Sequence, residues 1–168
     1  MRIIIDSREQ NPYTFAGYDV ETVTGSLVTG DYSLPGFDRP HGGISIERKE
    51  LSDLLGALTH DRERFTRELD RLYAFQSAAL VIESPLLMIR SGRYRTRISP
   101  EAAEQSIISI MERYRLPVYF ARDRADAERF TYNFLRHFHR HAEQHYKALT
   151  VETADNGRDK ERISVETA

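Results

Sequence analysis

The stretch ISIERKELSDLLGAL, residues 44–58, joins a strand pattern directly to a helix pattern. Residues 44–49 alternate apolar and polar side chains, as expected of a strand that is buried on one face. Four leucines then recur at the spacing of one buried helix face, namely Leu51, Leu54, Leu55 and Leu58. The stretch therefore predicts a strand that leads straight into a helix.

Strand and helix patterns alternate on both sides of this stretch. Upstream, residues 2–6 predict a buried strand, and the extended segments 19–28 and 32–34 suggest an antiparallel hairpin with residues 44–49. Downstream, the sequence predicts a helix around residues 65–72, a strand at 79–82, a helix from Ser99, a strand at 116–121 and a long helix from 123 to about 147. This alternation indicates an α/β fold in which helices flank a central mixed β-sheet.

The helix that begins after Ser99 has the clearest start. A hydroxyl side chain, a proline and an acid follow one another at Ser99, Pro100 and Glu101, as at many helix N-termini. The spacing of the apolar residues predicts a buried face made of Ala103, Ile107, Ile110, Met111 and Tyr114.

Length and composition limit the classes of protein that fit. A chain of 168 residues corresponds to about one domain. It has no cysteine, which excludes disulfide scaffolds, thiolate catalysis and cysteine-ligated zinc. No apolar run approaches the roughly 20 residues of a membrane span, and no basic and apolar leader follows Met1, so we expect neither membrane insertion nor export. The net charge of −2 means that any nucleic-acid site is a local patch.

Acidic and basic side chains converge at the end of the strand over residues 44–49. Because side chains alternate faces along a strand, Glu47 and Lys49 share one face and Arg48 lies on the other. The predicted hairpin brings Asp31 close to the first face. Two carboxylates and a lysine suit phosphodiester hydrolysis, because carboxylates hold a hard cation such as Mg²⁺ and the lysine stabilises phosphate oxygens or orients the attacking water. On spacing alone, a solvated hairpin face is the alternative.

The order of several motifs resembles the XPF-type family of nucleases. The residues GD at 30–31, ERK at 47–49 and the aspartate at 53 match that family's pattern GD…ERKxxxD. Further matches are the D-x-R-E segment at 6–9, the leucine three residues before the GD pair, the segment 54–62 that ends in an arginine, and the strand that ends at Glu83. The resemblance covers about residues 2–147.

The resemblance implies a restriction-endonuclease-like core that cuts DNA with Mg²⁺ or Mn²⁺. The residues that it implies as catalytic are Asp31, Glu47, Arg48, Lys49 and Asp53. Asp31 and Glu47 would be metal ligands, and Lys49 would act on the attacking water. Asp53 would assist the metal site or hold Arg48, and Arg48 would support the site or contact phosphate. Residues at the edge of the site would be Asp6, Arg8 and Glu9.

The sequence also departs from the family pattern. Many family members have a helix–hairpin–helix module after the nuclease domain and a helicase region before it, and neither fits into this chain. We therefore expect a stand-alone nuclease core of the compact prokaryotic or viral kind, cytoplasmic and associated with DNA. Homodimerisation, or a DNA-binding partner protein that supplies the missing module, stays open.

Two arginine-rich segments are candidates for phosphate binding. The first contains Arg90, Arg93, Arg95 and Arg97, and no acid lies between Ser84 and Ser99. Its arginines would contact phosphates while Tyr94 stacks on an exposed base, with a solvated loop as the alternative. The second contains Arg62, Arg64, Arg67 and Arg71, but it is interleaved with acids, which is typical of i,i+4 pairing on a solvated helix face. Within it, Arg62 matches the arginine of the family motif and is a candidate supporting residue.

Two features of the last long helix have competing interpretations. Four histidines occur there, at His137, His139, His141 and His145, two pairs of them at i,i+4 spacing. No acid or cysteine completes a zinc motif, and histidine is favoured near a helix C-terminus in any case. The stripe of Phe130, Phe134 and Phe138 indicates either core or a dimer face.

Residues 150–168 carry many charges and few apolar residues, so we expect a disordered tail after a nuclease domain that spans residues 1–149. The function expected of that domain is metal-dependent cleavage of flap, fork or branched DNA in repair or recombination. One alternative is a DNA-binding partner module without catalysis, which the intact acids and lysine argue against. The other is a restriction-type nuclease that acts on plain duplex.

Overall fold

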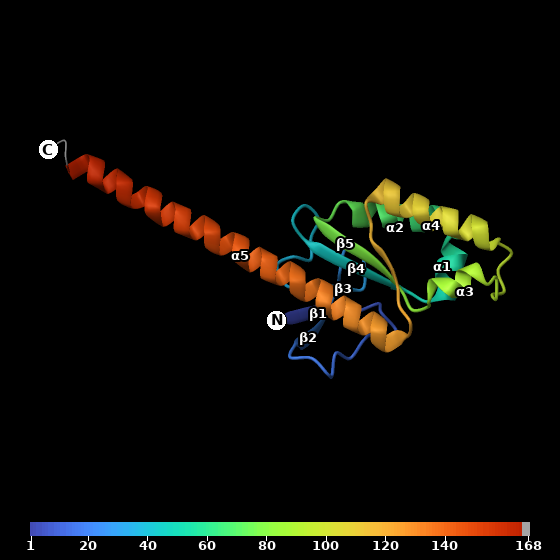
Figure 1. Cartoon of the computed structure of the whole chain (residues 1–168). Coiled ribbons are helices and arrows are strands. Elements are labelled where there is room, and N and C mark those ends of the chain that lie inside the picture. The colour runs from blue at the N-terminus through green and yellow to red at the C-terminus, as the bar shows by residue number, and fades with distance from the viewer. Residues whose placement is uncertain (166–168) are drawn as a thin grey trace.

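The computed structural model describes the backbone of residues 1–165 and the side chains of residues 1–147. Six strands form one sheet, which helices cover on both faces (Figure 1). The strands are β1 (Arg2–Asp6), β2 (Glu21–Gly25), β3 (Tyr32–Ser33), β4 (Ile44–Lys49), β5 (Ser77–Ile82) and β6 (Val118–Phe120). The helices are α1 (Leu51–Ala57), α2 (Arg62–Tyr73), α3 (Leu86–Arg90), α4 (Pro100–Tyr114) and α5 (Arg124–Val165). The predicted α/β fold with a mixed sheet is confirmed; the short helix α3 was not predicted.

The sheet has the strand order β2-β1-β3-β4-β5-β6. Strand β3 pairs antiparallel with both β1 and β4, while β1–β2, β4–β5 and β5–β6 are parallel pairs. The expected hairpin is therefore right for β3 and β4 but wrong for β2. The connection over residues 7–20 returns the chain to the amino end of β1, where the Glu21 N–H donates to the Met1 carbonyl, so β2 runs in the same direction as β1 at the sheet edge.

The alternation of side chains along β4 divides the molecule into two cores. Ile44 and Ile46 point to the face covered by α5, and Glu47 and Lys49 point to the face covered by the other helices. The same alternation holds in the neighbouring strand β5, where Leu80 lies on the same face as Glu47, in the core covered by α1 to α4. As a result, the polar residues of β4 lie beside an apolar cluster instead of in solvent.

The face of the sheet that carries Glu47 and Lys49 is covered by α1, α2, α3 and α4, whose leucines and isoleucines form one cluster with β5. Helix α4 begins as predicted, because the Ser99 hydroxyl accepts a hydrogen bond from the Ala102 N–H at 3.2 Å. Its predicted buried face is right except for Met111, which is 43% exposed. Met111 follows Ile110 by one residue, and a helix with 3.6 residues per turn carries it off the buried stripe.

The opposite face is covered by the first part of α5 together with the segment 13–18. The phenylalanine stripe of α5 packs within the chain: Phe130 stacks on Tyr119 with ring centroids 4.0 Å apart, and Phe138 meets Phe37 at 5.3 Å. The stripe therefore packs against the core within the chain, with its three rings half-buried. Homodimerisation stays a prediction.

Helix α5 extends well past the sheet (Figure 1) and ends at Val165, further than the end expected near Lys147. The sequence has no proline after Arg124 that would stop the helix earlier. The tail expected over residues 150–168 thus has a helical backbone as far as Val165, and residues 166–168 lie outside the described part. The boundary at residue 149 stays a prediction.

No helix in the described chain is long and apolar enough to cross a membrane.

Candidate active site

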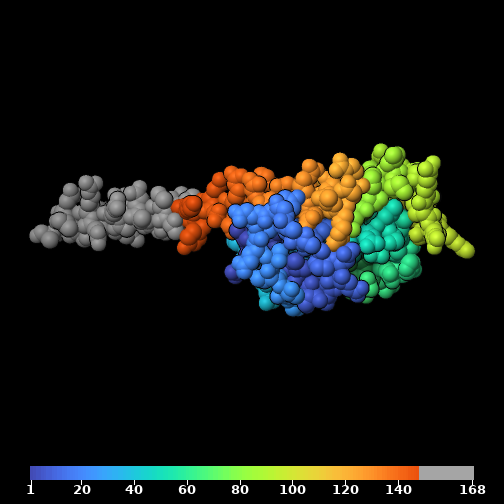
Figure 2. Space-filling model, turned by 90° about the horizontal axis from the view of Figure 1, so that it is seen from below, coloured from blue at the N-terminus to red at the C-terminus, as the bar shows by residue number. Residues whose placement is uncertain are grey.

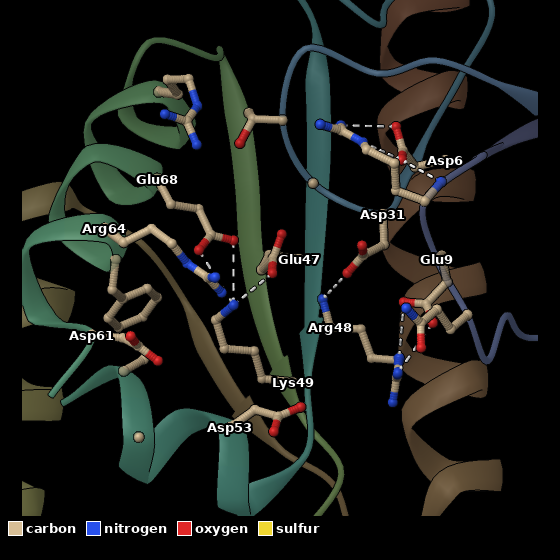
Figure 3. Close-up of a pocket in the computed structure, with 18 of the residues that line it drawn as sticks. Asp6, Glu9, Asp31, Glu47, Arg48, Lys49, Asp53, Asp61, Arg64 and Glu68 are labelled. Carbon is tan, nitrogen blue, oxygen red and sulfur yellow. Dashed lines mark hydrogen bonds and ion pairs between the residues drawn. The ribbon is translucent and has the colours of Figure 1, made fainter. Parts of the chain in front are cut away.

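A polar cleft of about 720 Å³ opens where β3, β4, α1 and α2 meet. Its floor is the carboxyl-terminal half of β4, and its walls are α2 on one side and the segments after β1 and β2 on the other (Figure 3). Among the predicted site residues, those that line it are Asp6, Arg8, Glu9, Asp31, Glu47, Arg48, Lys49 and Asp53. The fold therefore gathers every predicted catalytic residue around one cavity.

Glu47 and Lys49 form the centre of the cleft, on the same face of β4 as predicted. The Lys49 ammonium donates to Glu47 Oε1 at 2.7 Å and lies 3.3 Å from both carboxylate oxygens of Glu68 on α2 (Figure 3). It also lies 5.2 Å from the centre of the Phe65 ring. Both Glu47 and Lys49 are more than nine-tenths buried. Lys49 is thus held in one place by two carboxylates and an aromatic face.

Asp31 reaches the same cleft because the residue before it is glycine. Gly30 has a φ of +77°, and a Cβ there would meet the Ser45 hydroxyl at 2.1 Å. This close approach lets the Asp31 N–H donate to the Ile46 carbonyl at 2.7 Å, while its side chain accepts from the Arg48 N–H at 2.7 Å. The Gly-Asp pair therefore fixes a carboxylate beside β4 by backbone contacts alone.

Burial raises the pKa of both carboxylates of the cleft. Burial raises the pKa of Asp31 to about 7, even though the Arg48 N–H stabilises the charged form. Burial and then the charge of Asp31 raise the pKa of Glu47 well above its usual range. Burial works against the charged form of Lys49, but the charges of Glu47 and Glu68 outweigh it and raise the pKa of that lysine. The cleft thus concentrates negative charge that a bound cation would relieve.

The donor set fits a hard divalent cation that keeps several waters. Asp31, just before β3, and Glu47, on the adjacent β4, supply carboxylate oxygens, the ligands that Mg²⁺ and Mn²⁺ prefer. Within residues 1–147, no group of three or more acidic, histidine or cysteine side chains has the arrangement of a metal cage. Two carboxylates, with water in the remaining positions, is the usual way in which Mg²⁺ is held at phosphate-processing sites.

The Arg48 side chain lies away from Glu47 and Lys49, which leaves the supporting role as the alternative that its position favours. It points to the opposite face of β4, where its side chain is 9% exposed. There it bonds Glu9 at 3.1 Å and Glu83 at 3.1 Å, and Glu83 in turn pairs with Arg124 at 2.9 Å. Arg124 also donates to the Asn11 carbonyl at 2.7 Å. Arg48 therefore ties β4 to β5, α5 and the segment after β1, and it supports the site from behind.

Asp53 lines the cleft from the first turn of α1 but is exposed. Its carboxylate accepts a hydrogen bond from the adjacent Ser52 hydroxyl at 3.5 Å. The expected pairing with Arg48 is wrong, because the Arg48 side chain lies on the other face of β4. Its role as a third metal ligand stays a prediction.

Asp6 and Arg8 form a structural clamp at the edge of the cleft. The Asp6 carboxylate is 2% exposed and accepts hydrogen bonds from the Leu27 N–H at 2.7 Å and from the Arg8 side chain at 2.7 and 3.0 Å. Arg8 also donates to the Leu27 carbonyl at 2.8 Å. Because Leu27 leads into Gly30-Asp31, the clamp fixes the loop that carries Asp31.

We expect Asp6→Ala to lower the free energy of unfolding at pH 7 by about 2–3 kcal/mol, the cost of losing hydrogen bonds to a buried charged group. Burial favours the protonated form, but bonds from Arg8 and Leu27 outweigh it and lower the pKa of Asp6. Its contribution is therefore present above pH 4 and is lost as the pH falls through the lowered pKa. Urea unfolding at pH 7 and pH 3 tests this, since the difference from wild type should shrink at pH 3. An unchanged stability with loss of metal binding would instead make Asp6 a ligand.

Glu68 is the site residue that the sequence reasoning missed. The run of charges on α2 is typical of i,i+4 pairs on a solvated face, but no ion pair forms among the described side chains of α2, and Glu68 points to Lys49. Arg64 and Arg71 line the same cleft, whereas Arg62 lies outside it. Residues 64, 68 and 71 share one helix face by their spacing, and that face could have been recognised once α2 was placed beside β4.

The segment after α3 is only partly as predicted. Arg90 pairs with Glu104 of α4, with its Nε 3.2 Å from the carboxylate, so its charge is neutralised. Tyr94 does not stand free for a base, because its hydroxyl donates to the Ile98 carbonyl at 3.1 Å and its ring packs on the core under α1 and α4. Arg93, Arg95 and Arg97 are exposed.

The histidines of α5 form no metal site in the described part of the chain. The rings of His137 and His141 have centroids 6.3 Å apart, and His139 lies 3.6 Å from Glu143. These are contacts between neighbouring turns of one helix.

Comparison with known proteins gives a consistent result. The family model described as "ERCC4 domain" matches residues 5–134. No curated protein is matched by the sequence of this chain. The solved structure of XPF from Aeropyrum pernix is similar with a TM-score of 0.67 and 20% sequence identity, covering 88% of this chain and 69% of that one. A second, XPF from Aeropyrum pernix in complex with DNA, gives a TM-score of 0.63 and 21% identity, covering 80% and 63%. The fold is therefore that of the XPF nuclease, which confirms the expected restriction-endonuclease-like core.

Proposed function

Because the chain belongs to the ERCC4 domain family of DNA endonucleases, we propose that the cleft around Asp31, Glu47 and Lys49 hydrolyses DNA phosphodiester bonds with Mg²⁺ or Mn²⁺. The observation that carries the proposal is the meeting of the buried Glu47 carboxylate, the half-buried Asp31 carboxylate and a fixed lysine in an open cavity. The preferred substrates would be flap, fork or branched DNA, in repair or recombination.

The side chains divide the work of hydrolysis. Lys49 presents its ammonium to the cavity from a fixed position, where it can donate to the phosphate oxygen that gains charge or hold the attacking water. Glu47 and Glu68 keep that ammonium charged and aligned. Asp31 and Glu47 would hold the cation, which would neutralise charge on the phosphate and acidify a bound water. Arg48 keeps β4 in register from the opposite face.

We expect Glu68→Gln to lower kcat about tenfold with little change in KM, because Lys49 loses one charge-assisted bond but the cleft keeps its shape. Glu68 acts as a positioning residue through Lys49. Since the charge of Glu68 helps to raise the Lys49 pKa, the variant should lose activity at a lower pH on the alkaline side. A pH–rate profile measures this shift.

Glu63→Gln is the matched control, because Glu63 is exposed on the same helix and does not line the cleft. Equal kcat and an unshifted alkaline limb in Glu68→Gln would show that Lys49 does not depend on Glu68.

The substrate is tested with labelled single-stranded, duplex, flap, splayed-arm and four-way DNA, each with Mg²⁺ or EDTA. Cuts near a branch that need the cation support the proposal. Cuts at defined positions in unbranched duplex would favour a restriction-type nuclease instead. Binding without any cut on the panel would favour a partner module, and light scattering with and without DNA would then test homodimerisation.

A further inference from the structure

The cleft itself is a poor attractor of DNA. Seven acidic and five basic residues line it, so a bound divalent cation would leave it close to neutral. Non-specific DNA affinity comes largely from cationic side chains that displace counterions from phosphates. The chain as a whole carries a net charge of −2. The cations that hold the DNA must therefore be concentrated in some patch outside the cleft.

The segment between α3 and α4, residues 91–99, has such a patch and is built to display it. Along this segment Arg93, Arg95 and Arg97 are exposed, while the alternate residues Tyr94 and Ile98 pack on the core. The bond from the Tyr94 hydroxyl to the Ile98 carbonyl closes the loop around that anchor. Within the described residues, no acidic side chain pairs with any of the three arginines, in contrast to Arg90, which Glu104 neutralises.

The position of the loop relates it to the cleft through α1. Tyr94 and Ile98 belong to the same apolar cluster as Leu54 and Leu55, on the inner side of α1, while Ser52 and Asp53 on the other side of α1 line the cleft. The loop projects at the end of the molecule away from the long part of α5 (Figures 1 and 2). Among residues 1–147, the three arginines are exposed to solvent.

We propose that Arg93, Arg95 and Arg97 form a phosphate-binding surface that holds the DNA flank next to the cleavage site. The inference rests on the proposed function and extends it, because it separates the residues that bind DNA from those that cut it. The arginines contact the backbone and read no base sequence. Tyr94 serves as the anchor of the loop.

The test uses the full chain with Arg93→Gln, Arg95→Gln and Arg97→Gln combined. The matched control combines Arg115→Gln, Arg136→Gln and Arg140→Gln, three exposed arginines that do not line the cleft, lie outside the loop and pair with no acidic side chain within the described residues. Binding to a labelled splayed-arm DNA in EDTA is measured over a range of salt concentrations. Each phosphate contact contributes a slope of about 0.9 in log K against log salt for duplex DNA, so the loop variant should lose a slope of about 2–3 and the control should lose little. Circular dichroism and the melting temperature check the fold of both.

Cleavage supplies the second readout. With Mg²⁺, the loop variant should show a KM raised at least about tenfold and an almost unchanged single-turnover rate at saturating DNA. Equal salt slopes and equal KM for the loop variant and the wild type would overturn the inference, as would an equal loss in the control. Because binding is measured in EDTA, this result is independent of cleavage. A wild-type protein that binds DNA but cuts none would contradict the proposed function alone.

Discussion

Lys49→Met is expected to lower the single-turnover cleavage rate by about 10³-fold without unfolding the protein. The ammonium of Lys49 lies 2.7 Å from Glu47 and is aimed into the cavity, so its removal takes away the donor for the developing charge. Methionine fills a similar volume beside Phe65, and the two glutamates can share a proton in place of the lost cation. Rates on the preferred DNA substrate, with a melting curve for each protein, measure the effect.

Lys147→Met is the matched control, because Lys147 lies on α5 outside the cleft and the same charge is lost. Its rate should equal that of the wild type. Retention of more than about a tenth of the wild-type rate by Lys49→Met would remove the lysine from the chemistry.

Asp31→Asn is expected to abolish cleavage, by at least about 100-fold, and also to stabilise the metal-free protein at alkaline pH. The pKa of Asp31 is raised to about 7, chiefly by burial, so the folded protein binds this proton more tightly than the unfolded chain. The wild-type free energy of unfolding should therefore fall as the pH rises from about 4 to 7, and the variant should escape that fall. Asparagine can still accept the Arg48 N–H, which keeps the loop in place.

Urea unfolding in EDTA at pH 5 and pH 8 measures the second effect. The stability gained by Asp31→Asn should be larger at pH 8. Mg²⁺ should raise the melting temperature of the wild type and leave that of the variant unchanged. A variant that is less stable than the wild type at pH 8 would show that the charge of Asp31 does not destabilise the fold. A variant that Mg²⁺ still stabilises fully would show that Asp31 is not a metal ligand.

Local patterns predicted most of the secondary structure, because strand alternation and helix spacing report burial directly. The strand at 44–49 and the helix that begins at Pro100 are examples. The pairing of β2 with β1 could not be predicted in this way. It depends on the path of residues 7–20 and on the clamp from Asp6 to Leu27, neither of which has a local signal. Met111 was placed wrongly because one helix position decides between core and solvent.

For the site, sequence order and strand parity placed Glu47 and Lys49 correctly on one face and Arg48 on the other. What the sequence did not reveal was the partner of each charge. Glu68 forms an ion pair with Lys49 and not with an arginine of its own helix, and Glu83 forms an ion pair with Arg48. Such partners are set by which elements pack together, and an isolated charge pattern on a helix carries no information about its neighbour across the fold.

The most direct test of the central claim is a cation titration of cleavage. Purified protein is incubated with a labelled splayed-arm DNA in EDTA, and Mg²⁺ or Mn²⁺ is then added in steps, with Lys49→Met and Asp31→Asn run beside the wild type. We predict no cleavage in EDTA, cuts near the branch that appear with the cation in the wild type, and almost none in either variant. Cleavage at the wild-type rate in EDTA, or in both variants, would contradict the assignment of the reaction to this cleft.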